Sequence, residues 1–335
     1  MKAAVWREKG RFEIVTAPDP APAPGEIVLR VAYCGVCGSD VHRASTHGEM
    51  SPGVVIGHEY CGTIAALGAG VASWKEGDRV TCASVTPDVH TRPRFTPRMV
   101  ARTGEPGSLH QGAFAEYKRL AANNLLAIPP AIDDFNASLI EPTAIAVHAV
   151  ERAQIALGDR VGILGLGQIG LLIMQVARAA GAQTVYGFDP SAVRRQAARV
   201  LGIDAVYDPT DADPVEVLES MPGGAPEVIF DCAAAPATLD QALRAVRARG
   251  RVVLVGMSWD PVTVHPIEWL ARHVDLRTLY AYTRRHCEVS ADLIATGKVR
   301  TAALTRPEWT FPIEGINQAF QQSVDATLVK AIVRL

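Results

Sequence analysis

The chain has 335 residues, of which 48% are hydrophobic and 20% charged, and its formal net charge is −2. Because one core rarely grows beyond roughly 250–300 residues, this length predicts two domains. The near-zero charge gives no drive toward nucleic acid or an anionic membrane, and no window reaches the about 18 apolar residues of a membrane span. The N-terminal apolar run stops after four residues, too short for a signal peptide, so we expect a cytoplasmic protein.

The first part of the chain, residues 1–143, has the pattern of short β-strands separated by Gly and Pro. Such spacing is typical of a compact, β-rich, barrel-like domain. The Pro-rich segment 18–26 cannot lie inside a sheet and is expected to be a connector. The expected strands are FEIV (12–15), EIVLRVAY (26–33), VVIGHEYCGTIAAL (54–67), DRVTCA (78–83) and AFAEYKRL (113–120).

The second part, residues 144–282, alternates apolar strands with amphipathic helices. Helices are expected at 168–180 and 237–249, each followed by a glycine. Six strands alternating with helices predict an α/β fold with a doubly wound parallel sheet. Residues 283–335 return to a mixed pattern and are expected to complete the first domain. The six expected strands are 161–165, 184–189, 205–208, 227–233, 251–257 and 276–282.

A glycine-rich turn, GLGQIG (165–170), directly follows the first of these strands and opens a helix. Glycines at these positions allow a tight turn, a close approach of pyrophosphate and close packing of helix on strand. Asp189 ends the next strand, where a carboxylate binds ribose hydroxyls and repels a 2′-phosphate, which favours NAD over NADP. Arg194 and Arg195 could weaken that preference. The candidate cofactor-binding residues here are Gly165, Gly167, Gln168, Ile169, Gly170, Asp189 and Arg194.

The stretch CGVCGSDVH (34–42) has three possible meanings: a redox dithiol, half of a structural zinc site, or part of a catalytic metal centre. Catalytic zinc usually takes three protein ligands and keeps one position open. Cys37, His58 and Glu141 would supply a thiolate, an imidazole and a carboxylate, although spacing alone does not show that they converge. Six cysteines spread over a chain of this length do not form a disulfide framework.

Taken together, the motifs resemble the zinc-dependent medium-chain alcohol dehydrogenases over nearly the whole chain. The glutamate at position 141 is similar to the polyol (sorbitol-type) branch. The resemblance implies a GroES-like catalytic domain (1–143), a Rossmann NAD-binding domain (144–282) and a return segment (283–335). The motifs that carry it are CGVCGSDVH (34–42), GHEYCG (57–62), EGDRV (76–80), GAFAEY (112–117), EPTAIAVHA (141–149) and GLGQIG (165–170).

By position, the resemblance makes Cys37 and His58 zinc ligands and puts Glu141 in the place of the third. Glu59 is implied to lie beside the metal and to exchange as a ligand, while Asp40 is expected to accept a hydrogen bond from His58. The resemblance further implies a proton relay from Ser39 to His42, and a contact of Lys330 with the cofactor pyrophosphate.

One departure from the family pattern concerns the structural zinc that many members carry. The interval 81–111 contains a single cysteine, Cys82, so we expect one catalytic zinc per subunit and no structural zinc. His90 and His110 in this interval are expected to be loop histidines. The resemblance implies that Cys34 is not a metal ligand, and the other cysteines are expected to pack as small apolar side chains: Cys61, Cys82, Cys232 and Cys287.

The implied activity is reversible hydride transfer between NAD and a secondary alcohol, polyol or sugar-like alcohol. Three alternatives stay open: a zinc-free quinone or enone reductase on the same fold, a non-catalytic nucleotide-binding relative, and a CxxC thiol oxidoreductase. The expected partners are a small alcohol or ketone substrate and further copies of the chain, in a homodimer or homotetramer. The candidate contact is an edge strand at PVTVHP (261–266).

Overall fold

The computed structural model describes residues 1–45, 50, 52–83, 112–258 and 261–335. The chain divides into two compact units. Unit 1 comprises Met1–Glu141, Ala281–Ala295 and Thr305–Leu335, and unit 2 comprises Pro142–Tyr280 and Thr296–Leu304. The chain therefore leaves unit 1 twice and returns to it twice.

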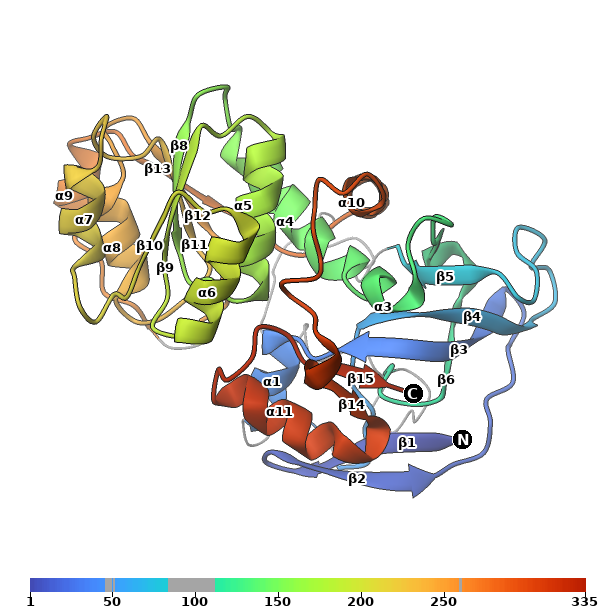
Figure 1. Ribbon diagram of the computed structural model, residues 1–335. Helices are drawn as coiled ribbons and strands as arrows, with labels where there is room; N and C mark the ends of the chain where they lie inside the picture. The colour runs from blue at the N-terminus through green and yellow to red at the C-terminus, as the bar shows by residue number, and fades with distance from the viewer. Residues whose placement is uncertain (46–49, 51, 84–111, 259–260) are drawn as a thin grey trace. The chain divides into compact units, whose positions relative to one another are not determined.

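Unit 1 is built on largely antiparallel β-structure (Figure 1). Within its described residues, strands pair in the order β14-β15-β3-β4-β5-β7, with β6 also paired to β3, and β1 pairs with β2. The strands are β1 (Lys2–Glu8), β2 (Arg11–Thr16), β3 (Glu26–Gly35), β4 (Glu59–Leu67), β5 (Arg79–Cys82), β6 (Tyr117–Ala121), β7 (Leu125–Ala127), β14 (Thr310–Pro312) and β15 (Ile332–Arg334). The helical segments are α1 (Gly38–Ser45), η1 (Ala122–Asn124), α3 (Asp134–Ala137), α10 (Arg284–Ala295), η2 (Pro307–Trp309), η3 (Ile313–Gly315) and α11 (Ile316–Val324).

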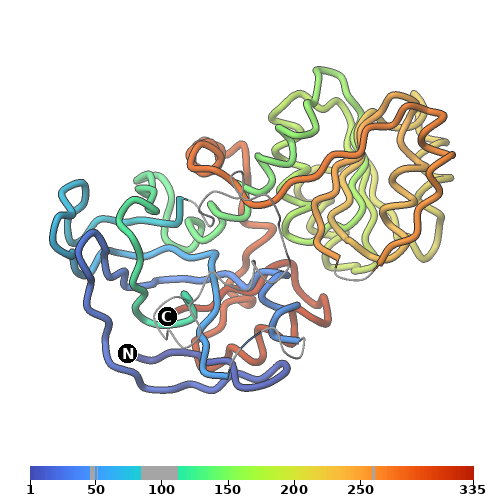
Figure 2. Tube along the Cα trace, turned by 180° about the vertical axis from the view of Figure 1, so that it is seen from behind, coloured from blue at the N-terminus to red at the C-terminus, as the bar shows by residue number. Residues whose placement is uncertain are grey.

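The C-terminal strand β15 pairs antiparallel with the end of β3, with Ile332 opposite Gly35. Figure 2 shows this C-terminal segment among the strands from the N-terminal part of the chain. On its other side β3 pairs with β4, with Gly35 opposite Glu59. The pairing therefore brings residues 35, 59 and 332 together, although they are far apart in the sequence.

Unit 2 is a parallel sheet with helices on both faces (Figure 1). Its described residues form six strands in the order β10-β9-β8-β11-β12-β13, which confirms the predicted doubly wound sheet. Helices α5 and α6 lie on one face, and α7, α8 and α9 on the other. The strands are β8 (Arg160–Leu164), β9 (Thr184–Phe188), β10 (Ala205–Tyr207), β11 (Val228–Asp231), β12 (Arg251–Leu254) and β13 (Asp275–Thr278). The helices are α4 (Ile140–Ala153), which begins in unit 1, α5 (Gln168–Ala179), α6 (Ala192–Leu201), α7 (Pro214–Ser220), α8 (Thr238–Ala245) and α9 (Pro266–Leu270).

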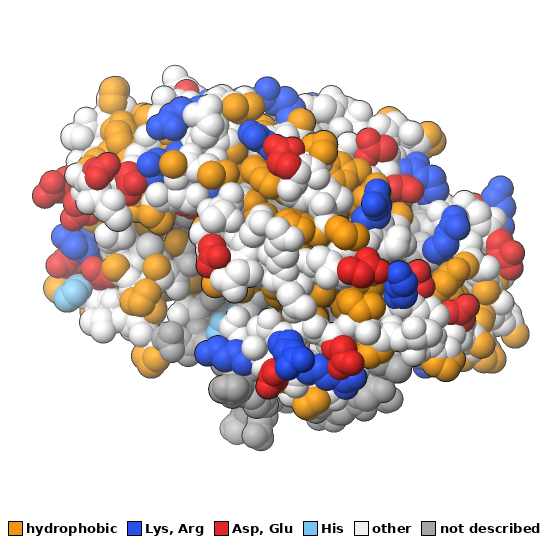
Figure 3. Space-filling model, turned by 60° about the horizontal axis from the view of Figure 1, so that its bottom comes forward, with side chains coloured by type: hydrophobic (Ala, Val, Ile, Leu, Met, Phe, Trp, Pro, Cys, Tyr) orange, Lys and Arg blue, Asp and Glu red, His pale blue; other side chains and the backbone are white. Residues whose placement is uncertain are grey.

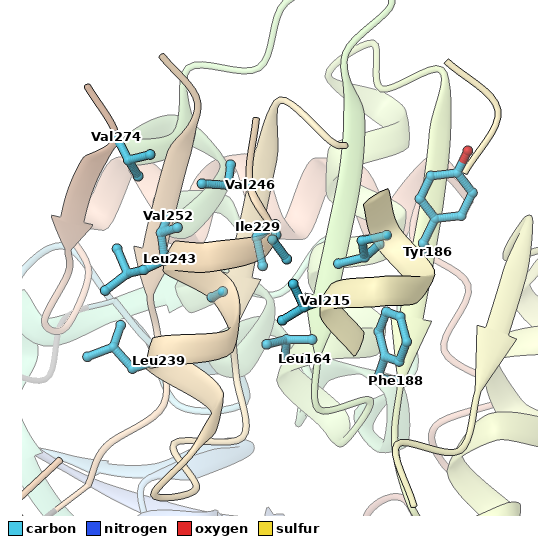
Figure 4. Close-up of a cluster of buried hydrophobic side chains, with 13 residues drawn as sticks. Leu164, Tyr186, Phe188, Val215, Ile229, Leu239, Leu243, Val246, Val252 and Val274 are labelled. Atoms are coloured by element: carbon cyan, nitrogen blue, oxygen red, sulfur yellow. The ribbon is translucent and has the colours of Figure 1, made fainter. Parts of the chain in front are cut away.

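The core of unit 2 explains why its inner strands are mostly apolar. Ile229 and Val252 point from the sheet toward Leu239 and Leu243 of α8, as Figure 4 shows. Because helices also cover the other face, a strand such as β8 is buried on both sides, and residues 161–164 are all buried. The glycine-rich turn directly follows β8, a central strand of this buried sheet.

Several segments differ from the sequence prediction. Strand β4 begins at Glu59 rather than at residue 54, because Gly57 has a φ of +105° that interrupts an extended conformation. Helix α8 ends at Ala245, four residues earlier than expected. PVTVHP (261–266) is not a strand, because its two prolines cannot donate to a ladder, and the outer strand is β13 instead. Strand β1 was not predicted.

The surface has mixed charge. On the face drawn in Figure 3, Lys and Arg side chains are interspersed with Asp and Glu, which agrees with the net charge of −2. In the part of the chain that the structure describes, no helix is both long enough and apolar enough to cross a membrane.

Candidate functional site: a nucleotide turn and a metal centre

The glycine-rich turn of unit 2 needs its glycines for specific steric reasons. Gly165 has a φ of +92°, and a Cβ there would lie 3.0 Å from the Cβ of Ala233. A Cβ on Gly170 would come within 3.3 Å of Cγ2 of Ile163 and would also collide with the carbonyl of Gly165. A Cβ on Gly167 would meet only the Arg194 guanidinium, 3.9 Å away, so this position is open to a ligand. The turn has the shape of a pyrophosphate cradle.

Polar groups around this turn also fit a dinucleotide. Asp189 is 2% exposed and accepts a hydrogen bond of 2.8 Å from the backbone N–H of Leu166. Among the described residues, Nε2 of Gln168 and Nε of Arg194 are buried without a hydrogen-bond partner. Ile169 lies beside Gln168 in the first turn of α5. Buried donors with no partner next to an open turn suit the oxygens of a phosphate-bearing ligand.

The candidate metal centre lies in unit 1. Among the described residues, one set of His, Cys and acidic side chains brings its potential ligand atoms within 4.8 Å of one another: Cys37, His58 and Glu59. The pairing of β3 with β4 explains this convergence, since Cys37 comes two residues after the end of β3 and His58 directly precedes β4. Thiolate, imidazole and carboxylate are ligands that zinc takes in catalytic sites.

Asp40 orients the imidazole of His58. Its Oδ1 lies 3.4 Å from Nδ1 of His58, and its Oδ2 accepts a hydrogen bond of 3.3 Å from the N–H of Cys37. Burial opposes ionisation of Asp40, but His58, Arg43 and the N–H of Cys37 together outweigh it, and the pKa of Asp40 is lowered. Burial likewise lowers the pKa of His58, yet Asp40 and Cys37 together raise it well above its ordinary value. With Nδ1 directed at Asp40, Nε2 is the nitrogen left to bind a metal ion.

Glu59 has one oxygen engaged and one free. Its Oε2 pairs with Nζ of Lys330, which also donates a hydrogen bond of 2.8 Å to the carbonyl of Val36. Its Oε1 is buried and has no hydrogen-bond partner among the described residues. A Cβ on Gly35 would lie 2.6 Å from Cε of Lys330, so this pairing requires glycine at position 35. The free oxygen of Glu59 is therefore available to a metal ion, while Lys330 is occupied by Glu59.

Glu141, in the first turn of α4, is 4% exposed and lies outside the set of Cys37, His58 and Glu59. Burial raises the pKa of Glu141 to about 7, although the nearby His58 and a hydrogen bond from Tyr282 lower it. Tyr282 was missed by the sequence prediction because no motif marks it. Glu141 is therefore a second carboxylate close to the centre.

The remaining candidate residues lie as follows. Ser39 and His42 are half-buried, three positions apart on α1, and therefore share one face of the helix. Cys34 is fully buried, and burial raises the pKa of its thiol well above the ordinary value, which disfavours a redox dithiol. Cys61, Cys82 and Cys287 are also buried, whereas Cys232 is partly exposed. The expected absence of a structural zinc concerns mainly residues 84–111, which lie outside the described residues.

Comparison with known proteins decides the family. Two family models match, "Alcohol dehydrogenase GroES-like domain" over residues 23–130 and "Zinc-binding dehydrogenase" over residues 169–296. The sorbitol dehydrogenase of Gallus gallus is 32% identical over 346 residues, covering 99% of this chain and 96% of that protein. The chain belongs to the zinc-dependent medium-chain alcohol dehydrogenases. Its relatives place this dehydrogenase in the polyol branch, and the predicted family, fold and enzyme class are confirmed.

Other relatives of this dehydrogenase agree. The (R,R)-butanediol dehydrogenase of Bacillus subtilis is 30% identical over 298 residues, covering 84% of this chain and 85% of that protein. An alcohol dehydrogenase of E. coli CFT073, solved with NADH, superposes with a TM-score of 0.87 at 27% identity, covering 100% of this chain and 99% of that one. A zinc-binding dehydrogenase of Sinorhizobium meliloti 1021, solved with NADP, gives 0.86 at 29% identity with the same coverage.

Proposed function

We propose that this dehydrogenase transfers hydride reversibly between a secondary alcohol of the polyol class and NAD, using one zinc ion per subunit. The observation that carries the proposal is the set of Cys37, His58 and Glu59, in which a buried carboxylate oxygen has no partner among the described residues. Buried polar atoms are normally satisfied, so this oxygen supports a metal ligand. The sorbitol and butanediol dehydrogenases among the relatives support the substrate class.

Cys37 and His58 would hold the zinc, with Glu59 or Glu141 as the third ligand. When bound, zinc supplies Lewis acidity that polarises an alcohol or carbonyl oxygen, and NAD exchanges hydride with the carbon. Asp40 keeps the His58 ring in place. Oγ of Ser39 accepts the proton of the substrate hydroxyl while it gives its own proton to the imidazole of His42, which releases a proton to solvent.

A Ser39→Ala variant is expected to lower kcat by about 100-fold or more, the scale of a lost acid–base step, while the zinc content stays unchanged. Ser39 lies in the first turn of α1, where alanine preserves the helix. Steady-state rates and zinc analysis of the purified protein measure both quantities. Ser45→Ala, at the other end of α1, is the matched control and should retain normal turnover. Normal turnover in Ser39→Ala would rule out the relay.

A substrate panel tests the proposed reaction. Secondary alcohols, sorbitol, (R,R)-butanediol and other polyols are incubated with NAD or NADP, and reduction of the cofactor is followed by absorbance. Zinc-dependent oxidation of at least one polyol, lost after chelation and restored by zinc, is expected. Purified protein that holds no zinc and oxidises none of these alcohols would contradict the proposal and support the zinc-free reductase instead.

We further propose a cytoplasmic homodimer or homotetramer that forms through the outer strand β13. As an edge strand it offers unpaired backbone groups, and exposed apolar side chains lie on it and on α9 nearby in the sequence. Ile267, Leu270 and Leu276 are 71%, 63% and 39% exposed. Sedimentation equilibrium of the wild type and of Leu270→Glu tests this contact, because a monomeric wild type contradicts it.

A further inference from the structure

The loop that follows β11, residues 232–237, lies beside the glycine-rich turn. Strands β8 and β11 are neighbours in the sheet, although the chain runs from β8 through β9 and β10 before it returns to β11. In an open parallel sheet, ligands bind outside the carboxyl ends of the strands at such a reversal. The loop touches the turn, since a Cβ on Gly165 would lie 2.8 Å from the backbone N of Ala233. Ala233 and residues 235–237 are exposed, so the loop presents small side chains and backbone to a ligand.

Asp231, the last residue of β11, holds this loop through its side chain, which is fully buried. Its Oδ1 accepts the backbone N–H groups of Ala233 and Ala234 at 3.2 and 3.0 Å. Its Oδ2 accepts the hydroxyl of Thr238, the first residue of α8, at 3.1 Å. One carboxylate therefore fixes both the beginning and the end of the loop.

The conformation of the loop costs free energy. Ala234 has a φ of +49°, in the left-handed region that disfavours a residue with a Cβ. It also packs closely on the turn after β12, where a Cβ on Gly256 would be 2.7 Å from the Cβ of Ala234. Burial raises the pKa of Asp231, and the hydrogen bonds to its carboxylate offset this only in part. Such costs persist where the surrounding structure enforces them, and they are typical of functional sites.

We propose that Asp231 is a positioning residue for the cofactor, because its carboxylate keeps loop 232–237 in the shape that the dinucleotide contacts. A loop that is ordered before binding spares the ligand the entropy of ordering it. Asp231 is buried and acts through the loop, without touching the cofactor itself. The inference rests on the proposed function, because it assumes that the turn binds a nicotinamide dinucleotide.

Two pairs of variants and one control separate positioning from stability. Asp231→Leu removes the acceptors at similar volume, whereas Asp231→Asn keeps an oxygen for the two N–H groups and should rescue binding. Ala234→Pro excludes the positive φ and removes one of the N–H donors, whereas Ala234→Gly keeps both features. Asp159→Leu is the control, because Asp159 is also buried and accepts a backbone N–H, but it directly precedes β8 at the amino end of that strand.

Equilibrium binding of NADH, followed by nicotinamide fluorescence, measures this role without turnover. Asp231→Leu and Ala234→Pro are expected to raise the Kd of NADH by about 10-fold or more, while the other three variants stay within about 3-fold of wild type. Hydrogen exchange of the loop without cofactor should be faster in the same two variants. In steady-state kinetics their KM for NAD should rise, with kcat at saturating NAD and the zinc content little changed.

Wild type that does not bind NADH overturns the proposed function and this inference together. Wild type that binds NADH, with a folded Asp231→Leu of unchanged Kd, overturns the inference alone. The same holds if Asp231→Asn binds as weakly as Asp231→Leu, or if Asp159→Leu weakens NADH binding as much. If Asp231→Leu does not fold, Ala234→Pro decides by the same comparison with wild type, since it changes the loop and leaves the carboxylate in place.

Discussion

A Glu59→Gln variant is expected to lose most of its zinc, while a Glu141→Gln variant keeps it. Glu59 belongs to the set whose ligand atoms lie within 4.8 Å of one another, and its Oε1 has no other partner among the described residues. The loss in zinc affinity should exceed the roughly 10- to 100-fold that removing an outer hydrogen-bond partner costs. Competition with a chromogenic chelator measures the affinity, and elemental analysis gives the stoichiometry.

Glu141→Gln is the matched control, because it changes another buried carboxylate near the same histidine to an amide. Removing Glu59 alone leaves Lys330 buried without its partner, which destabilises the fold. The double variant Glu59→Gln, Lys330→Met removes both members of the pair and keeps the test valid if the single variant unfolds. Zinc retained by the folded double variant, together with zinc lost from Glu141→Gln, would make Glu141 the third ligand.

The fold could be predicted because the sequence features that indicate it are local. Apolar strands, intervening helices and the glycines at 165, 167 and 170 each report on a few neighbouring residues. The segment 261–266 shows the limit of such signals. Its alternating valines suggested a strand, but Pro261 and Pro266 prevented ladder pairing, and β13, with half of its residues charged, became the outer strand.

The candidate site could be predicted only where a motif marks its residues. Cys37, His58, Glu59 and Glu141 were all proposed from the sequence. Which of the two glutamates lies beside Cys37 and His58, however, depends on strand register. Gly35 pairs with Glu59, and this register places Glu59 rather than Glu141 beside Cys37. Side chains that contact each other only through tertiary packing leave no pattern in the local sequence. The pairing of Lys330 with Glu59 spans 271 residues and follows from the return of β15 to β3.

Lys118→Met is expected to stabilise the protein by about 3 kcal/mol at pH 7, which is the energy of a pKa lowered from 10.5 to about 8. Lys118 of β6 is 8% exposed, and its Nζ lies 5.3 Å from the centre of the Tyr60 ring. Burial lowers the pKa of Lys118, and the nearby thiols of Cys82 and Cys34 offset this only in part. No ion pair of Lys118 with a carboxylate occurs among the described residues, so its charged form is costly to bury.

The pH dependence of this stability difference shows whether the buried charge of Lys118 causes it. Below pH 8 the lysine is charged in both the folded and the unfolded states, and its full cost is present. Between about pH 8 and 10.5 the folded state releases the proton first, so the unfolded state binds more protons and the cost disappears as the pH rises.

The difference in unfolding free energy between Lys118→Met and wild type, from urea titrations at pH 7, 8, 9 and 10, should therefore shrink with pH. Lys75→Met, an exposed control in the same unit, should show no such trend. A destabilised Lys118→Met variant, or a difference independent of pH, would mean that the ammonium group is stabilised by contacts that offset its burial.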